Sequence, residues 1–173
     1  MKKLILISLF FFISSVNILT ANTNIVFLDM DKVIATSKPG LLILNELNEI
    51  NNNNIKLFQG EQNKLKNKEQ KIISQKNILS DSEFKTSISK LKIEVDTYNE
   101  RRKKIITRFN KSKIDNTNNL LKQINVILTT YTNEKSISII LQKKNIIIGK
   151  TELDITSEII KIINSSIKEF KFK

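Results

Sequence analysis

Basic side chains form the densest cluster of chemically competent residues in this sequence. Arg101, Arg102, Lys103 and Lys104 are consecutive, and Arg108 follows about one helical turn later. Guanidinium and ammonium groups at this spacing could bind a phosphate or another anionic group. The same residues could also form a solvated helix face without any ligand. We interpret them as the candidate site for an anionic ligand or an anionic membrane surface.

Catalytic chemistry has little support in the composition. The sequence contains no His, Cys or Trp, which excludes thiol nucleophiles, disulfides, imidazole bases and nearly all zinc sites. Its 3 Gly residues and single Pro cannot build the glycine-rich turns that hold phosphates. The paired carboxylates Asp29 and Asp31 more simply cap a helix. We therefore predict no catalytic residue, no metal site and no cofactor, although a Ser/Lys hydrolase stays formally possible.

The chain is strongly basic, with 29 Lys and Arg against 17 Asp and Glu and a net charge of +12. The excess is concentrated between Gly60 and Lys113, where 15 basic and 7 acidic residues give +8. A pI near 9.8 is also typical of nucleic-acid-binding proteins. No such motif is present, and the aromatic residues are not interleaved as a stacking platform requires. Nucleic acid is expected to bind only non-specifically.

The first 21 residues have the pattern of a secretory signal peptide. Met1-Lys2-Lys3 precedes a short apolar run from Leu4 to Ile13, and Ala21 offers a cleavage position. The run is shorter than the roughly 20 apolar residues that a transmembrane helix needs. We predict export to a bacterial periplasm, with a retained N-terminal anchor as the alternative.

Residues 41–134 are predicted to form an antiparallel hairpin of two long helices. Apolar residues recur at alternating spacings of four and three, which is a heptad seam. The first helix has one ladder (Leu44, Phe58, Leu65, Ile72, Leu79). The second has two phases (Phe84, Ile88, Leu91, Val95, Tyr98, Arg102, Ile105 and Phe109, then Thr117, Leu120, Ile124, Ile127 and Tyr131). The arm should be thin, because two helices bury only one strip. Gly60 weakens it and is either a tolerated defect or a hinge.

The tip of the hairpin is predicted near residues 80–82. Ser80 and Glu83 have the spacing of a capping box, in which each side chain satisfies the main-chain N–H of the other. The second helix should therefore begin here.

Residues 22–40 and 135–173 are predicted to form one small head. Residues 24–28 read as a strand, and residues 137–141 and 146–148 as two more. Asp154 or Thr156 should cap a last amphipathic helix. The fold class is α+β, mainly α. Consecutive isoleucines suggest strands buried on both faces, so the head should be completed by oligomerisation through a set of apolar side chains (Ile25, Phe27, Ile137, Ile139, Ile140, Ile146, Ile148).

This order of elements resembles the Skp/OmpH family of periplasmic chaperones. The opening stretch from Ile25 to Val33 is similar to the family's first strand and helix, and Leu153-Asp154-Ile155-Thr156 is similar to the start of its last helix. The resemblance spans residues 24–164. It implies a homotrimer whose helical hairpins surround a cavity that holds unfolded outer-membrane proteins without ATP. It also suggests binding to anionic lipid or lipopolysaccharide surfaces.

Under that resemblance, apolar residues outside the seam are the candidate client contacts: Leu57, Ile73, Ile78 and Ile93. The seam residues themselves more simply form the core of the hairpin. A basic coiled coil that binds nucleic acid non-specifically is the main alternative, and a structural coiled-coil spacer in the cell envelope is the second.

Overall fold

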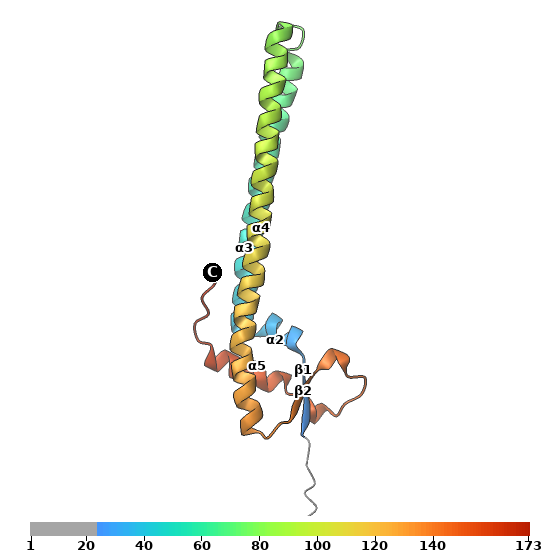
Figure 1. The fold of residues 1–173 in the computed structure, drawn as a ribbon, viewed down its shortest axis with the longest axis vertical. Helices are drawn as coiled ribbons and strands as arrows, with labels where there is room; N and C mark the ends of the chain where they lie inside the picture. The colour runs from blue at the N-terminus through green and yellow to red at the C-terminus, as the bar shows by residue number, and fades with distance from the viewer. Residues whose placement is uncertain (1–23) are drawn as a thin grey trace, which may run out of the picture.

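The computed structural model describes residues 24–173, so the predicted signal peptide (1–21) lies outside the described residues. The elements follow in the order β1 (Ile25–Leu28), α2 (Met30–Thr36), α3 (Lys38–Ser74), α4 (Asp81–Glu134), β2 (Ile139–Gln142) and α5 (Thr156–Ser166). Two short 3-10 turns, η1 (Lys143–Asn145) and η2 (Thr151–Leu153), separate β2 from α5. Helices α3 and α4 form a long hairpin with the head at its base (Figure 1). The predicted mainly α fold with a small sheet is confirmed.

Side-chain caps fix where the helices begin. The Asp29 carboxylate accepts a hydrogen bond from the Lys32 N–H over 2.9 Å and caps α2. The Ser37 hydroxyl accepts from the Gly40 N–H, so α3 starts at Lys38 and includes Pro39 in its first turn. The first long helix is therefore three residues longer at its start than the predicted one.

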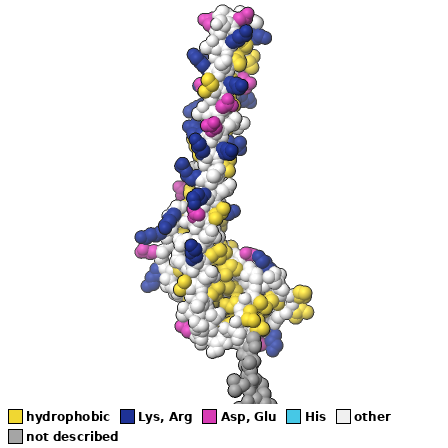
Figure 2. Space-filling model, viewed as in Figure 1, with side chains coloured by type: hydrophobic (Ala, Val, Ile, Leu, Met, Phe, Trp, Pro, Cys, Tyr) yellow, Lys and Arg dark blue, Asp and Glu magenta, His cyan; other side chains and the backbone are white. Residues whose placement is uncertain are grey.

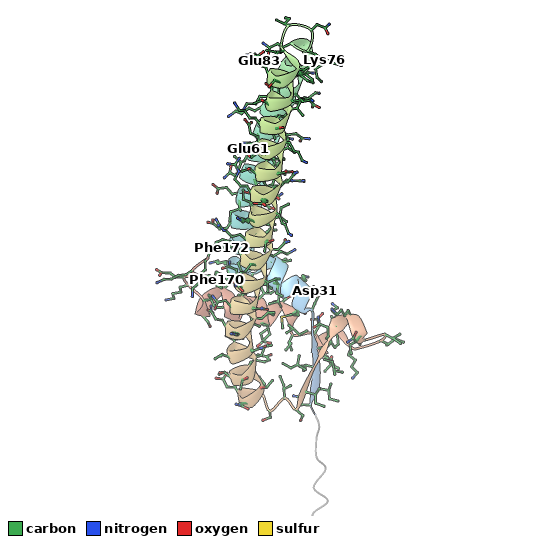
Figure 3. All side chains as sticks on the ribbon, turned by 45° about the horizontal axis from the view of Figure 1, so that its top comes forward. Asp31, Glu61, Lys76, Glu83, Phe170 and Phe172 are labelled. Carbon is green, nitrogen blue, oxygen red and sulfur yellow. The ribbon has the colours of Figure 1, made fainter. Side chains whose placement is uncertain are left out.

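The capping box at the tip is present. Glu83 donates its N–H to the Ser80 hydroxyl over 3.3 Å, and the Glu83 carboxylate accepts the Ser80 N–H over 3.0 Å. Hydrogen bonds from the hydroxyl and then the N–H of Ser80 lower the pKa of the Glu83 carboxyl. These contacts begin α4 at Asp81 and leave residues 75–80 for the turn, with Lys76 and Glu83 at the tip (Figure 3).

The helix seam follows the predicted ladder over most of the arm but not at its base. Phe58 and Leu65 are half-buried, whereas Leu44 is 48% exposed, and Ile43 and Leu47 are buried in its place. A straight α-helix drifts about 20° per heptad relative to a strict seven-residue ladder, so the contact line moves to neighbouring residues along the helix. Packing of α2 and α5 against α3 also covers the side on which Ile43 lies.

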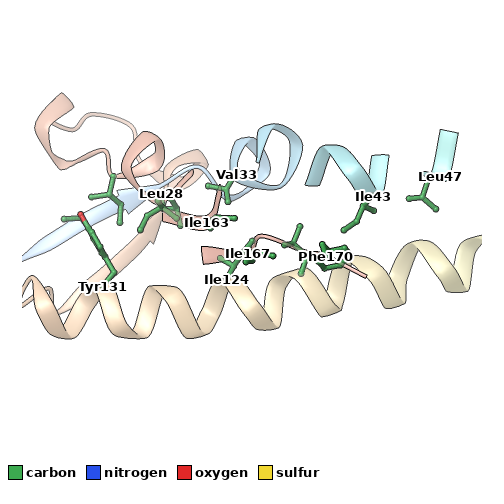
Figure 4. Close-up of a cluster of buried hydrophobic side chains, with 13 residues drawn as sticks. Leu28, Val33, Ile43, Leu47, Ile124, Tyr131, Ile163, Ile167 and Phe170 are labelled. Carbon is green, nitrogen blue, oxygen red and sulfur yellow. The ribbon is translucent and has the colours of Figure 1, made fainter. Parts of the chain in front are cut away.

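The head is built from both ends of the chain. Strands β1 and β2 are parallel, with Ile25 opposite Ile139, and the whole hairpin is the crossover between them. Val26 and Leu28 point into the core, where they join Ile159 and Ile163 of α5 (Figure 4). The core continues along the base of the hairpin through a further group of buried side chains (Val33, Ile43, Leu47, Leu120, Ile124, Tyr131, Ile155, Ile167, Phe170).

The third strand predicted at residues 146–148 is not formed. The chain turns through η1 after β2, and Phe27 makes an isolated bridge to Asp154 instead. Where the chain leaves β2, the Lys143 ammonium lies 6.0 Å from the centre of the Phe27 ring and 2.6 Å from the Asp154 carboxylate. A Cβ on Gly149 would lie 2.8 Å from the Phe27 ring, so glycine at this position lets the main chain pass close to that ring.

The start of α5 also differs from the prediction. The residue before the helix is Ile155, and no side chain caps it from that position. The Asp154 carboxylate nevertheless accepts a hydrogen bond from the Thr156 N–H over 3.0 Å. The predicted Asp154 thus satisfies the first N–H of α5, although it lies two residues before the first residue of the helix.

Candidate functional site

A groove lies between α3 and α4 in the outer half of the arm. It has a volume of about 380 Å³ and combines apolar side chains with charged ones from both helices (Glu61, Lys64, Leu65, Lys68, Ile93, Glu94, Thr97, Tyr98, Arg101). Two ion pairs cross it, Lys68 with Glu94 at 2.5 Å and Arg101 with Glu61. The groove therefore offers an apolar strip bounded by paired charges, and Glu61 lies midway along the hairpin (Figure 3).

The five side chains of the basic cluster (Arg101, Arg102, Lys103, Lys104, Arg108) have different surroundings. Arg101 is paired with Glu61, and the Arg102 guanidinium lies 5.6 Å from the centre of the Phe58 ring. Lys103 and Lys104 are exposed, and Arg108 lines a different groove nearer the head. Basic side chains are spread along the whole visible face of the arm instead of forming one patch (Figure 2). As an anionic-ligand site, the cluster stays a prediction.

The four predicted client contacts are all exposed apolar side chains. Leu57 and Ile73 belong to α3, Ile78 lies in the turn at the tip, and Ile93 belongs to α4. Among them, only Ile93 lines the groove. Leu65 and Tyr98 also line it, and the sequence reasoning missed them because their seam positions indicated core. Their partial exposure follows from the thinness of a two-helix seam. Binding by any of these residues stays a prediction.

Helix α3 passes through Gly60 without interruption, beside Glu61 of the groove. A Cβ built on Gly60 would meet nothing within 4 Å. Glycine is thus not required there by packing, and its role as a hinge stays a prediction.

The head presents an apolar face that its own chain leaves open. Ile25, Ile139 and Leu141 are exposed on one side of the two strands, while Val26 and Leu28 face the core. Ile147 and Ile148, in the segment after η1, are 97% and 92% exposed. Hydrophobic side chains gather over the head in Figure 2. Of the other head residues predicted to join chains, Phe27 is buried within this chain and Ile137, Ile140 and Ile146 are half-buried.

Two polar contacts inside the head change the pKa values of Tyr131 and Asp154. Burial and then the hydrogen bond to Glu158, at 2.8 Å, raise the pKa of Tyr131 to about 12. Burial also opposes ionisation of Asp154, but hydrogen bonds from Lys143 and from the hydroxyl and N–H of Thr156 outweigh it. Together they lower the pKa of Asp154 to about 2.

Residues 24–173 contain no group of three or more acidic side chains positioned to hold a metal ion. Within the same range, no helix combines the length and apolar character needed to cross a membrane.

Comparison with known proteins identifies the family. A family model described as "Outer membrane protein (OmpH-like)" matches residues 24–163, and the chain therefore belongs to this OmpH-like family. The fold is similar to that of a solved OmpH-like protein from Caulobacter crescentus CB15, which is described as a candidate outer membrane chaperone. The TM-score is 0.80 at 13% identity, over 88% of this chain and 90% of that one. The search of curated proteins gave no match. Family model and solved structure therefore agree on an OmpH-like fold for this chain.

Proposed function

We propose that the protein is an ATP-independent holdase that binds unfolded outer-membrane proteins between basic helical arms. The observation that carries the proposal is the arm itself. It exposes single apolar side chains (Leu57, Ile73, Ile78, Ile93), and its residues 60–113 carry a net charge of +8. Unfolded β-barrel chains expose alternating apolar residues and aggregate through unpaired strands. Many weak contacts can hold such a chain without ordering it.

The proposed active form is a homotrimer joined through the head. The open apolar face of Ile25, Ile139 and Leu141, with Ile147 and Ile148 beside it, is the surface that association would cover. Residues 146–148 could then pair with a strand edge of a neighbouring chain. Three arms would surround a cavity with a charge of about +24, which would attract acidic clients in a salt-dependent manner.

Sedimentation of the protein tests this assembly. We expect the wild-type protein to be a trimer. The double variant Ile139→Lys with Leu141→Lys places charges on the open face and should be a monomer. The matched control, Leu57→Lys with Ile93→Lys, places the same charges on the arm and should stay trimeric. A stable wild-type monomer would contradict the assigned role of the head.

We further propose that the protein works in the periplasm after removal of residues 1–21. Its basic arms would also approach anionic lipid or lipopolysaccharide surfaces, where each Lys or Arg contributes about 1 kcal/mol. Nucleic acid would bind only through charge, because the arm carries no base-reading motif.

Suppression of aggregation is the test of the holdase role. The protein should keep a urea-denatured outer-membrane protein from scattering light after dilution, with no nucleotide present. Replacing Leu57, Ile73, Ile78 and Ile93 by Ser should weaken this effect, whereas Ser at the exposed Ile114 and Val126, outside the proposed surface, should not. An inert wild-type protein would favour the envelope spacer.

A further inference from the structure

The last residues of the chain lie along the base of the hairpin and fill a groove there. Helix α5 ends at Ser166, and residues 167–173 continue without regular secondary structure beside α3 and α4 (Figure 1). Phe170 is 8% exposed and belongs to the main core, and Phe172 is partly buried. The two aromatic side chains alternate with the exposed Lys171 and Lys173. The segment thus resembles one strand of an amphipathic sheet in its pattern.

The hydrogen bonds between this segment and α4 join side chains of the helix to the main chain of Lys173. Asn116, which is 1% exposed, accepts the Lys173 N–H and donates its amide to the main-chain oxygen of Lys173, both over 2.9 Å. The Ser112 hydroxyl donates to the same oxygen over 2.9 Å. One side-chain amide therefore satisfies both main-chain groups of a single residue, as a neighbouring strand does in an antiparallel ladder. Such contacts are independent of the side chain held.

The groove has room beyond what the segment fills. Phe172 and Lys173 border a hollow of about 540 Å³ whose other walls come from both helices (Ile50, Asn54, Ile105, Arg108, Phe109, Ser112). A second hollow of about 330 Å³ borders Lys173 on the side of Asn116, Asn119 and Lys122. A longer extended chain could therefore occupy the same path with its aromatic residues in the first hollow.

We propose that this groove is a binding site for extended peptide segments with aromatic residues at alternate positions, and that residues 168–173 occupy it as an internal competitor. The proposal rests on the proposed holdase function, because the strands of unfolded outer-membrane proteins supply segments of this kind. The family match ends at residue 163, so the competing segment lies beyond the matched region. Because a tethered competitor has an effective concentration in the millimolar range, only segments that bind the groove more tightly than it does can displace it.

A short labelled peptide, Lys-Glu-Phe-Lys-Phe-Lys, copies residues 168–173 and probes the groove directly. Its fluorescence anisotropy should report weak binding to the wild-type protein. Phe170→Ser with Phe172→Ser should strengthen binding by about tenfold or more, because the competing segment no longer lowers the fraction of open grooves. Adding Asn116→Ala should remove this gain, whereas Asn125→Ala on the exposed face of α4 should leave it. A control peptide with Ser in place of both Phe residues should not bind.

A second measurement keeps the full segment and its folded head. The natural chain has no Cys, so Lys171→Cys gives a single dye position on an exposed side chain. Saturating Phe peptide should release the segment and lower the dye anisotropy, and the Ser peptide should not. Failure of the Phe peptide to change the anisotropy, or binding that is indifferent to Asn116→Ala, would overturn the proposal.

The two proposals fail separately. If aggregation is suppressed but the Phe peptide affects neither readout, the groove proposal is wrong and the holdase role stands. If the peptide binds through Asn116 while aggregation proceeds unchecked, the groove is a peptide site and the holdase role is wrong.

Discussion

The main-chain N–H of Asp29 donates a hydrogen bond to the hydroxyl of Thr156 over 2.9 Å, which joins residues 127 positions apart. The same hydroxyl donates to the Asp154 carboxylate, 2.5 Å away. Thr156 is buried, and among the described residues no buried side-chain nitrogen or oxygen lacks a partner. This one side chain therefore links the N-terminal strand–helix corner to the start of α5.

Thr156→Val should destabilise the head, because it keeps the shape of the side chain but leaves the Asp29 N–H without its acceptor. The free energy of unfolding should fall by about 1–3 kcal/mol, the usual cost of an unsatisfied buried group. Urea denaturation measures the change. Thr151→Val, at an exposed position of the same head, is the matched control and should change stability little.

Asp154 should make stability depend on pH in the acid range. Its folded pKa, about 2, lies below the ordinary value of 3.8, so the unfolded chain binds the proton more readily. The contribution is therefore complete above about pH 4 and is lost as the pH falls toward 2. Denaturation from pH 6 to pH 2 should show a smaller acid loss for Asp154→Asn than for wild type. The control is Asp115→Asn, because the exposed Asp115 carboxylate pairs with Lys111 in the arm. This variant should lose stability with falling pH as the wild type does. The same acid loss in Asp154→Asn as in the wild type would contradict this account.

Gly60 and Gly40 should respond in opposite ways to alanine. Gly60→Ala adds a Cβ in open space and should stabilise α3 by about 1 kcal/mol. Gly40→Ala would place its Cβ 1.7 Å from the Ile34 carbonyl oxygen and should destabilise the corner between α2 and α3. Thermal unfolding measures both variants. If Gly60 is a hinge, the stiffer variant should also suppress client aggregation less well, and unchanged suppression would make it a tolerated defect.

The exposed lysines of the basic cluster should govern the rate of client capture more than its arginines. Lys103→Gln with Lys104→Gln should slow capture at low salt and have little effect at high salt, because screening removes long-range attraction. Arg101→Gln should slow it less, since Glu61 already compensates that charge. Stopped-flow fluorescence of a labelled denatured client gives the rates, with Lys32→Gln and Lys161→Gln in the head as the control. Equal slowing at both salt concentrations would remove the electrostatic part of the mechanism.

Sequence reasoning succeeded where the determining contacts are local. The capping box of Ser80 and Glu83 and the cap of Asp29 join groups three residues apart, so their spacing in the chain predicts them. It failed at residues 146–148, because a run of isoleucines favours a strand but cannot supply the edge with which it pairs. It also missed the exposure of Leu44, which depends on how far α3 departs from an ideal seven-residue repeat.

The sequence alone determined the long hairpin, the capping box that begins its second helix and its basic charge, whereas the turn lies at residues 75–80, just before the predicted tip. These features follow from periodicity, capping and composition, which act over a few residues. Only the tertiary structure decided which isoleucines stay open on the head and that Asn116 holds the main chain of Lys173, 57 residues away. The reason is physical: residues of the same type become core or surface according to distant segments that pack over them, and local spacing carries no record of those segments.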